Sequence, residues 1–382
     1  MGDYCYVAVK WEDALRIGLI APPLLPVPPP RYGGTERIVH VLAEGLHARG
    51  HDVTLFASGD SRVSCPLVQT VDRATWSGGA DDLESGMAQV AAAVQSRATS
   101  FDLLHSHLDT FGFELALDAG VPMLSTMHGR LDEPPTQAML SAHPDLPLVA
   151  ISHHQRASAP SATWLGVVHH GLDLASAPFG RTAGDYLLFV GRVNRLKGTV
   201  AAIELAQRVG QRLLIVAKVR DDEEAELFEQ VVRPALRPGR IDFLGELAAT
   251  ARDRLFAGAL ATLMLGDWPE PFGLVAIESL ATGTPVIATR HGALPEIVEH
   301  GRDGFIVDEP HDADRAVRLA ALLDRQAIRR RAIRRFSVQR MVDEYLVLYR
   351  RLLGRRERSA TSDEPEIEIT RPAVGRAGRV PG

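Results

Sequence analysis

Two glutamates lie eight residues apart in the stretch WPEPFGLVAIE, residues 268–278. Glu270 precedes a Pro-Phe-Gly turn, and Glu278 falls in the apolar run that follows the turn. The spacing of apolar residues after Gly273 predicts a helix that begins at this glycine. The first amides of a helix lack intrahelical partners and attract anions, whereas carboxylates accept hydrogen bonds from neighbouring hydroxyls. One carboxylate just outside and one just inside the helix N-terminus therefore suit a sugar nucleotide.

A pair of cations follows the apolar stretch at residues 186–190. Arg192 and Lys197 belong to GRVNRLKG, where the lysine precedes the glycine, so this is not the Walker loop G-x-x-x-x-G-K-[ST]. An isolated pair of this kind is more often a solvated surface feature. At the C-terminal end of a strand, however, both cations lie towards the same crevice as Glu270. There each can stabilise the charge on a departing nucleoside diphosphate by about 2–4 kcal/mol.

Further candidates follow other predicted strands. Gly33 and Gly34 either form a plain tight turn or let the backbone approach a phosphate without a Cβ in the way. Their pattern is not G-x-G-x-x-G, so it does not support a nicotinamide site. His128 ends a strand on the crevice side. Lys218 follows another strand, where it either reaches a phosphate or acceptor or is a surface charge.

Histidine is abundant, with 14 residues, but abundance is the only sign of a metal site. The cluster spacing typical of zinc is absent from the sequence, so we expect no metal. The other histidines considered as ligands are His105, His107, His153, His154, His169 and His170.

Strands and helices alternate twice along the chain. A strand at 16–21, a glycine loop, a helix and a strand at 52–57 form a mononucleotide-binding half of a doubly wound sheet. Further strands are predicted at 101–107, 121–128 and 148–152, and a second series at 186–190, 212–217, 241–245, 261–265, 284–289 and 304–307. In such sheets the ligand crevice lies outside the carboxyl ends of the strands, where the candidate residues fall.

This pattern divides the chain into two α/β units. We expect an extension at 1–14, a first domain at 15–173 and an aperiodic linker at 174–185. A second domain at 186–335 and a final amphipathic helix at 336–353 follow. Because periodicity stops at Gly354, residues 354–382 are predicted to be a disordered tail.

Composition excludes several classes of protein. The 382 residues, 46% hydrophobic and 24% charged, are typical of a soluble globular protein, and a net charge of −6 gives no sign of a nucleic-acid partner. Two cysteines cannot form a disulfide framework, which favours a cytoplasmic location. A transmembrane run of about 18 apolar residues is absent. The basic residues at 329–335 are interpreted as an exposed helix face, with weak peripheral membrane contact as the alternative.

Together these motifs resemble those of the family-4 retaining glycosyltransferases, also called glycosyl transferase group 1. EPFGLVAIE resembles the EX7E motif of that family, and VGRVNRLKG its Gly-Arg…Lys-Gly loop. RYGGTERIVHVLAEGLHARGHDVTLFA resembles its N-terminal signature, TMHG its strand-end histidine, and TGTPVIATRHGALPEIVEHGRDGFIV the segments after EX7E. The resemblance covers residues 16–353 in the same order.

The resemblance implies a GT-B fold, in which two Rossmann-like domains face a central cleft and the C-terminal helix crosses back to the N-terminal domain. It also implies metal-independent transfer of a sugar, with retention of configuration and without a cofactor. The donor would be a nucleotide sugar such as a UDP-, GDP- or ADP-sugar. The acceptor would be a small molecule, a glycan or a lipid-linked compound.

The same resemblance assigns roles to the candidate residues. Arg192 and Lys197 would bind the diphosphate, Glu270 the hydroxyls of the donor sugar, and Glu278 the ribose diol. His128 would contact the sugar near the reacting carbon. The backbone at Phe272, Gly273 and Leu274 would meet phosphate and sugar, and Gly33 and Gly34 the diphosphate from the other domain. Lys218 stands where many relatives have a glycine-rich turn.

Two other classes of function remain open. The first keeps the same fold but changes the reaction, to that of a sugar-nucleotide epimerase or a phosphorylase. The sequence shows no obvious surroundings for the cofactor-binding lysine that a phosphorylase would need. A non-catalytic sugar-nucleotide-binding protein is the third interpretation, and the intact pairs Arg192–Lys197 and Glu270–Glu278 argue against it.

Overall fold

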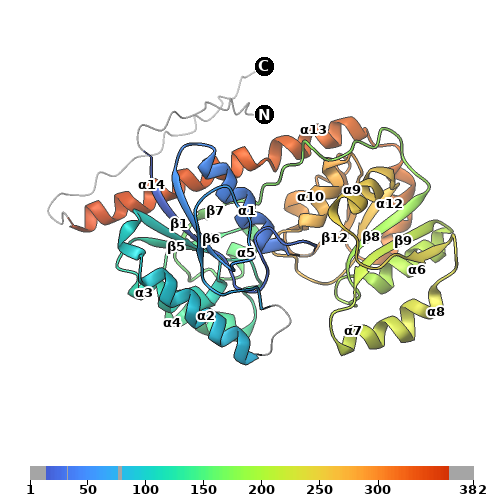
Figure 1. The fold of residues 1–382 in the computed structure, drawn as a ribbon. Helices are drawn as coiled ribbons and strands as arrows, with labels where there is room; N and C mark the ends of the chain where they lie inside the picture. Colours follow the sequence, from blue (N-terminus) through green and yellow to red (C-terminus); the bar gives the residue numbers. More distant parts are fainter. Residues whose placement is uncertain (1–13, 32, 76–79, 361–382) are drawn as a thin grey trace, which may run out of the picture.

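The computed structural model describes residues 14–31, 33–75 and 80–360. The expected N-terminal extension therefore lies almost wholly outside the described residues, as does the expected tail beyond residue 360. The described chain forms two lobes, each built around a parallel sheet with helices on both faces (Figure 1). This is the predicted α/β architecture.

The first lobe contains a seven-stranded sheet in the order β3-β2-β1-β4-β5-β6-β7. Its strands are β1 (Arg16–Ile20), β2 (Asp52–Ala57), β3 (Leu67–Gln69), β4 (Leu103–Ser106), β5 (Met123–Thr126), β6 (Leu148–Ala150) and β7 (Trp164–Val167). The central strands are buried on both faces, which explains their continuous apolar runs. The helices of this lobe are α1 (Gly34–His47), α2 (Ala80–Gln95), α3 (Phe113–Asp118), α4 (Pro134–Ala142) and α5 (His153–Ala157).

The second lobe contains a six-stranded sheet in the order β10-β9-β8-β11-β12-β13. Its strands are β8 (Tyr186–Arg192), β9 (Arg212–Lys218), β10 (Ile241–Phe243), β11 (Ala261–Met264), β12 (Val286–Thr289) and β13 (Gly304–Val307). Its helices are α6 (Thr199–Val209), α7 (Asp222–Leu227), α8 (Arg233–Ala235), α9 (Ala249–Gly258), α10 (Leu274–Ala281), α11 (Leu294–Ile297), α12 (Ala313–Ala320) and α13 (Arg325–Arg335). A π-helical turn, Phe228–Val232, joins α7 to α8.

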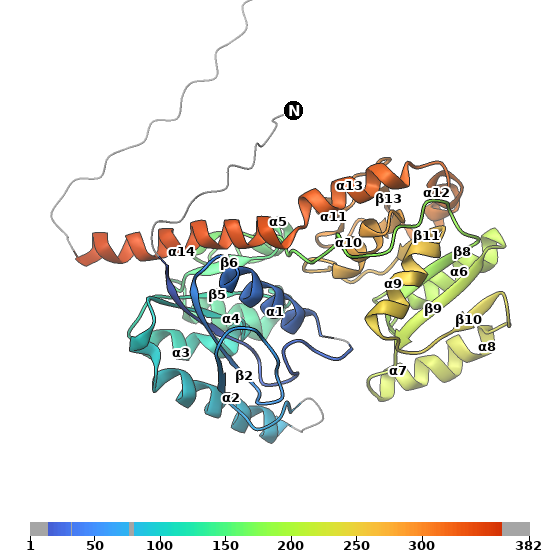
Figure 2. The same ribbon diagram turned by 45° about the horizontal axis from the view of Figure 1, so that its top comes forward.

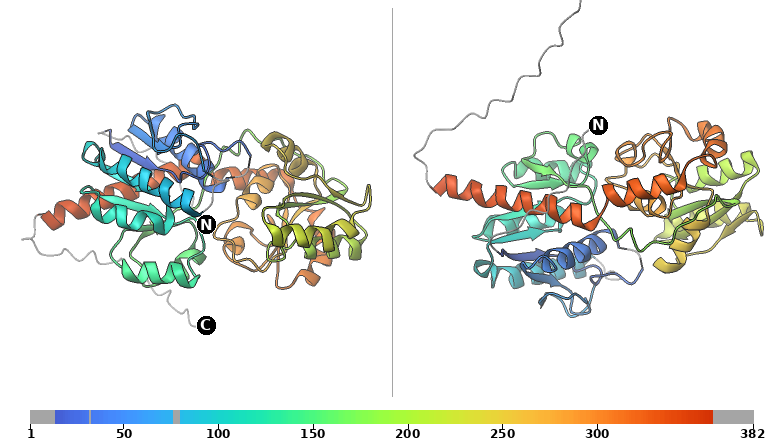
Figure 3. Two further views of the ribbon diagram at one scale, coloured as in Figure 1. Left: turned by 60° about the horizontal axis from the view of Figure 1, so that its bottom comes forward. Right: turned by 90° about the horizontal axis from the view of Figure 1, so that it is seen from above.

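The last helix, α14 (Val338–Ala360), returns from the second lobe to the first. Figures 2 and 3 show it continuing from α13 along the first lobe, where it packs against α1 and β7. Its stripe of Met341, Val342, Tyr345, Leu348 and Tyr349 is buried. The predicted end of this helix at residue 353 was wrong, because helical backbone continues to Ala360. Within the described residues, none of the helices has the length and hydropathy needed to cross a membrane.

Candidate functional site

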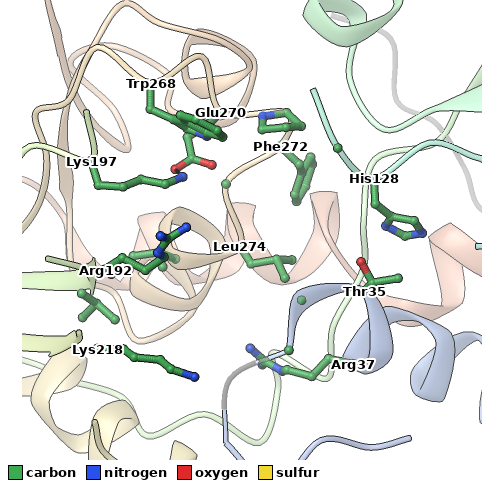
Figure 4. Close-up of a pocket in the computed structure, with 18 of the residues that line it drawn as sticks. Thr35, Arg37, His128, Arg192, Lys197, Lys218, Trp268, Glu270, Phe272 and Leu274 are labelled. Atoms are coloured by element: carbon green, nitrogen blue, oxygen red, sulfur yellow. Dashed lines mark hydrogen bonds and ion pairs between the residues drawn. The ribbon is translucent and has the colours of Figure 1, made fainter. Parts of the chain in front are cut away.

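A cavity of about 540 Å³ lies between the two lobes, at the carboxyl ends of the central strands. All the candidate site residues line this cavity: Gly33, Gly34, His128, Arg192, Lys197, Lys218, Glu270, Phe272, Gly273, Leu274 and Glu278. In Figure 4, Arg192, Lys197 and Lys218 extend from the second lobe, and Thr35, Arg37 and His128 lie on the opposite wall. The fold therefore brings the separately predicted residues into one space, whereas their individual roles stay predictions.

The glycine turns of the two lobes meet across this cavity. Gly273 is the N-cap of α10 and adopts a left-handed backbone, with φ of 106°, which a side chain would strain. A Cβ placed on Gly34 would lie 3.4 Å from Leu274 Cδ1, so the start of α1 approaches the start of α10. The first residues of both helices line the same cleft, where unpaired amides of a helix N-terminus attract anions.

Lys197 is paired with the first glutamate of the motif. Lys197 Nζ donates a hydrogen bond to Glu270 Oε1 over 2.6 Å and lies 4.5 Å from the centre of the Trp268 ring. Arg130, from the first lobe, lies 4.8 Å from the same ring. Burial lowers the pKa of Lys197, and the Glu270 carboxylate opposes this shift. Trp268 therefore lies near one cation from each lobe.

Arg192 is held by two carboxylates at the end of β8. One Nη atom lies 3.0 Å from Asp221 Oδ2 and 2.5 Å from Glu224 Oε1, and Glu224 is 1% exposed. In the register of β8 against β9, Arg192 pairs with Lys218, so the two cations leave adjacent strands side by side. The guanidinium is thus oriented before any ligand binds, which favours electrostatic stabilisation of an anion.

Glu278 accepts hydrogen bonds from two arginines. Arg37 of α1 and Arg252 of α9 each donate to Glu278 Oε1 over 2.7 Å, and Glu278 is only 7% exposed. Within the described part of the chain, the second oxygen, Oε2, has no such partner. The Arg37 contact crosses from one lobe to the other. Sequence reasoning did not predict either arginine.

His128 belongs to a cluster of neutral histidines. Its ring lies 2.8 Å from His107 and stacks on His170 at 5.3 Å between ring centres, while its backbone N–H donates to Asp109 Oδ1 over 2.5 Å. Burial lowers the pKa of His128 to about 3 and also lowers the pKa values of His107 and His170. His105 packs against His107 at 4.1 Å. A charged imidazolium is therefore excluded at neutral pH.

The sequence analysis gave no role to several residues that line the cavity: Arg37, Asp109, Arg130, Arg252 and Trp268. Arg37 had the clearest signal, because it lies in the first turn of the helix that Gly33 and Gly34 open. Arg130 and Trp268 come from loops, Asp109 from the short 3-10 helix Asp109–Gly112, and Arg252 from α9, whose amphipathicity is weak. The paths of such segments depend on tertiary packing.

One group of described residues has the composition of a metal site. His153, His169 and Glu296 place ligand atoms within 4.8 Å of one another, away from the cavity. Glu296 already accepts hydrogen bonds from the backbone N–H groups of His153 and His154, and it lies 3.0 Å from His169 Nε2. Arg335 and Arg340 line the adjoining pocket together with Glu344, which pairs with Arg340. These contacts explain the group without an ion.

Two family descriptions match consecutive parts of the chain. Residues 32–165 match Glycosyltransferase Family 4, and residues 179–337 match Glycosyl transferases group 1. The first match covers most of the first lobe and the second most of the second lobe.

Individual proteins are similar over different lengths. A D-inositol 3-phosphate glycosyltransferase of Mycolicibacterium smegmatis is 28% identical, covering 98% of this chain and 97% of that protein. Its counterpart in Pseudarthrobacter chlorophenolicus is 30% identical over 60% of this chain and 64% of its own length, so this match spans less than two thirds of that relative. The structure of Anabaena HepE in complex with UDP-glucose is 18% identical, with a TM-score of 0.67, and the match covers 90% of this chain and 99% of that one.

Proposed function

The chain belongs to the glycosyl transferases of group 1 and has their GT-B fold, and we propose that it moves a sugar from a nucleotide-sugar donor to an acceptor in the cavity between its lobes. One observation carries the proposal. Arg192, Lys197, Glu270 and Glu278, predicted from two separate motifs, line one cavity together with the N-terminus of α10.

The second lobe would bind the donor. Arg192 and Lys197 provide positive charge for the diphosphate, which gains negative charge when the sugar bond breaks. Glu278 Oε2 is available for the ribose hydroxyls, since both arginines bind Oε1. Glu270 would accept hydrogen bonds from the donor sugar, and its pairing with Lys197 places it next to the leaving diphosphate. The bound UDP-glucose of the HepE structure supports a nucleotide sugar of this type.

The finer chemistry is also part of the proposal. Arg192 and Lys197 supply charge stabilisation that other enzymes obtain from a divalent cation, so transfer would proceed without a metal. Retention of configuration follows from the resemblance of the Glu270–Glu278 stretch to the EX7E motif of retaining enzymes. Turnover measured in the presence of a chelator tests whether transfer requires a metal. The anomeric configuration of the product, determined by NMR, tests retention.

The acceptor would bind against the first lobe. That wall contains His128, Arg130 and Asp109, together with the apolar side chains of Leu24 and Phe111. The inositol phosphate acceptors in the names of the relatives define one class to test, alongside glycans and lipid-linked compounds.

A donor panel with two variants tests the proposal. We expect nucleoside diphosphate release from one nucleotide sugar, about 100-fold slower in Lys197→Ala because a preorganised cation is lost. Glu278→Ala should instead weaken donor binding at least about tenfold in calorimetric titration. Arg290→Ala removes an exposed arginine that pairs with Asp308 and should change neither value. Normal donor affinity in a folded Glu278→Ala protein would refute this site assignment.

A further inference from the structure

A hydrogen bond joins two histidine rings at the ends of neighbouring strands, and the proposed function gives this bond no role. His107 follows β4 and His128 follows β5, and His107 Nδ1 lies 2.8 Å from His128 Nε2. Both residues line the cavity, but His107 is only 1% exposed. His107 is therefore placed to act on a ligand through His128.

Both rings are neutral at physiological pH. Burial lowers the pKa of His107 well below its usual range and that of His128 to about 3. A neutral imidazole carries one N–H and one bare nitrogen, so in this hydrogen bond one ring donates and the other accepts. The direction of the bond decides which nitrogen of His128 carries the proton.

The surroundings of His107 indicate that His107 is the donor. Its second nitrogen, Nε2, is enclosed and has no hydrogen-bond partner among the described residues. If His128 donated, the proton of His107 would lie on this Nε2, as a buried N–H without a partner. Buried N–H groups without a partner are rarer than under-satisfied acceptors. The proton of His107 therefore lies on Nδ1, and His128 Nε2 accepts it.

This direction leaves the proton of His128 on its other nitrogen. In the described structure His128 Nδ1 has no hydrogen-bond partner, yet it is not enclosed, so it is open to the cavity. We propose that His107 is a positioning residue that holds His128 in the Nδ1–H tautomer, so that His128 donates a hydrogen bond to an oxygen of the bound sugar substrate. The identity of that ligand rests on the proposed function, whereas the tautomer does not.

The rest of the cluster fixes the ring in the same position. His170 stacks on His128, and Asp109 holds the backbone N–H of His128. A neutral donor suits a position near the reacting carbon, because positive charge develops on the sugar as the bond to the diphosphate breaks. An imidazolium there would repel this charge.

Two variants of similar size test the direction of the bond. His107→Asn keeps an N–H donor near the position of Nδ1, whereas His107→Asp places an acceptor there. In ¹⁵N-histidine-labelled protein, with the signals assigned by a His128→Gln variant, we expect the His128 proton on Nδ1 in the wild type and in His107→Asn. In His107→Asp the proton should move to Nε2. A wild-type His128 protonated on Nε2 would overturn the proposal.

Kinetics separate positioning from a structural role. His107→Leu removes the hydrogen bond, and kcat should fall about 10- to 100-fold, with less than about a threefold change in the donor KM. His107→Asn should retain kcat within about fivefold of wild type. If His107→Asn and His107→Leu lose kcat equally while their Tm values match wild type, His107 does not act through the hydrogen bond.

The spectra require no substrate, which separates this inference from the proposed function. Failure of the whole donor panel, with an Nδ1–H tautomer in the wild type, would refute glycosyl transfer but not the role of His107 in setting the tautomer. An active enzyme with an Nε2–H tautomer would refute the role of His107 and leave the proposed function intact.

Discussion

Burial changes the charge of two carboxyl groups that line the cavity. It raises the pKa of Glu36 to about 7 and that of Asp109 to about 6. Glu36 lies in the first turn of α1 and is 5% exposed. Near neutral pH, part of the negative charge that the sequence places in this cavity is therefore absent, which favours an anionic ligand.

Stability at alkaline pH should depend on Glu36. Between pH 4.5 and 7 the folded protein keeps the proton on Glu36 and the unfolded chain does not, so the free energy of unfolding falls as the pH rises. By about pH 8 the loss amounts to about 3 kcal/mol, at about 1.36 kcal/mol per pKa unit. Glu36→Gln should therefore gain stability over wild type between about pH 5 and pH 8, as measured by urea denaturation.

Glu44 on the same helix provides the opposite control. Hydrogen bonds from Ser64 lower the pKa of Glu44, although burial opposes the shift, so its contribution to stability is present above the unfolded pKa and lost as the pH falls. Glu44→Gln should lose stability relative to wild type at about pH 8. A Glu36→Gln difference that is the same at both ends of the pH range would show that folding does not raise the pKa of Glu36.

That Glu270 and Glu278 line one cavity could be predicted because the pattern around them is local. Glu270 and Glu278 flank a helix start whose apolar spacing and glycine are visible in eleven consecutive residues. The partners of these carboxylates were not predicted. Arg37 reaches Glu278 across 241 positions and Lys197 reaches Glu270 across 73, and no local pattern records such pairings.

One short helix of the second lobe, α11, is joined to a short helix of the first lobe, α5. Glu296 in α11 accepts hydrogen bonds from the backbone N–H groups of His153 and His154 at the start of α5. The first N–H groups of a helix have no partners within the helix, and a carboxylate satisfies them well. His169 adds a third contact, at 3.0 Å from Glu296 Oε2.

Removal of this carboxylate should destabilise the protein. We expect Glu296→Ala to lower the free energy of unfolding by about 2–3 kcal/mol, because two N–H groups at the start of a helix lose a charged acceptor. Glu299→Ala is the matched control. Glu299 forms a side-chain pair with Arg302 in which both residues are exposed, and its loss should cost less than about 0.5 kcal/mol. Equal values for the two variants in chemical denaturation would contradict the role of Glu296.

Some helices and strands could be predicted from the sequence, and others could not. The spacing of apolar residues after Gly273 predicted a helix that begins at this glycine, and α10 begins at Leu274 with Gly273 as its N-cap. The edge strands β3 and β7 were missed, since they are short, partly exposed, and defined by pairing with a neighbour.

The arginine-rich helix α13 was misinterpreted as a simple exposed face. Arg329 and Arg335 donate to backbone carbonyls, and Arg331 pairs with the buried Asp303. These guanidinium groups join α13 to the rest of the second lobe and to the linker. Less of the positive charge on α13 is therefore available for a membrane surface than the sequence indicated.

Helix α14 and the Arg37–Glu278 pair connect the two lobes in different ways. The buried tyrosines of α14 form hydrogen bonds inside the first lobe: Tyr349 with His105, and Tyr345 with Thr126. This contact is extensive and apolar, as expected of a permanent connection. Arg37 and Glu278, in contrast, meet within the cavity itself, where a ligand would bind.

Arg37 should therefore contribute to ligand affinity from the lobe opposite the donor site. Arg37→Met keeps most of the side-chain length but removes a cation that extends into the cavity, as Figure 4 shows. Arg252 still neutralises Glu278 in this variant, so the second lobe should remain intact. We expect calorimetry to show about five- to tenfold weaker binding of a nucleoside diphosphate, equivalent to about 1 kcal/mol. The salt dependence of binding should also decrease, because one charge is lost.

A second arginine near the end of α1 distinguishes this effect from a general loss of charge. Arg49 pairs with Asp343 of α14, outside the cavity, and Arg49→Met should leave the affinity for the diphosphate unchanged. If wild type and Arg37→Met bind the nucleoside diphosphate with equal affinity, Arg37 interacts with Glu278 but not with the bound ligand. Positive charge from the first lobe would then have to come from Arg130, which also lines the cavity and lies 4.8 Å from the centre of the Trp268 ring.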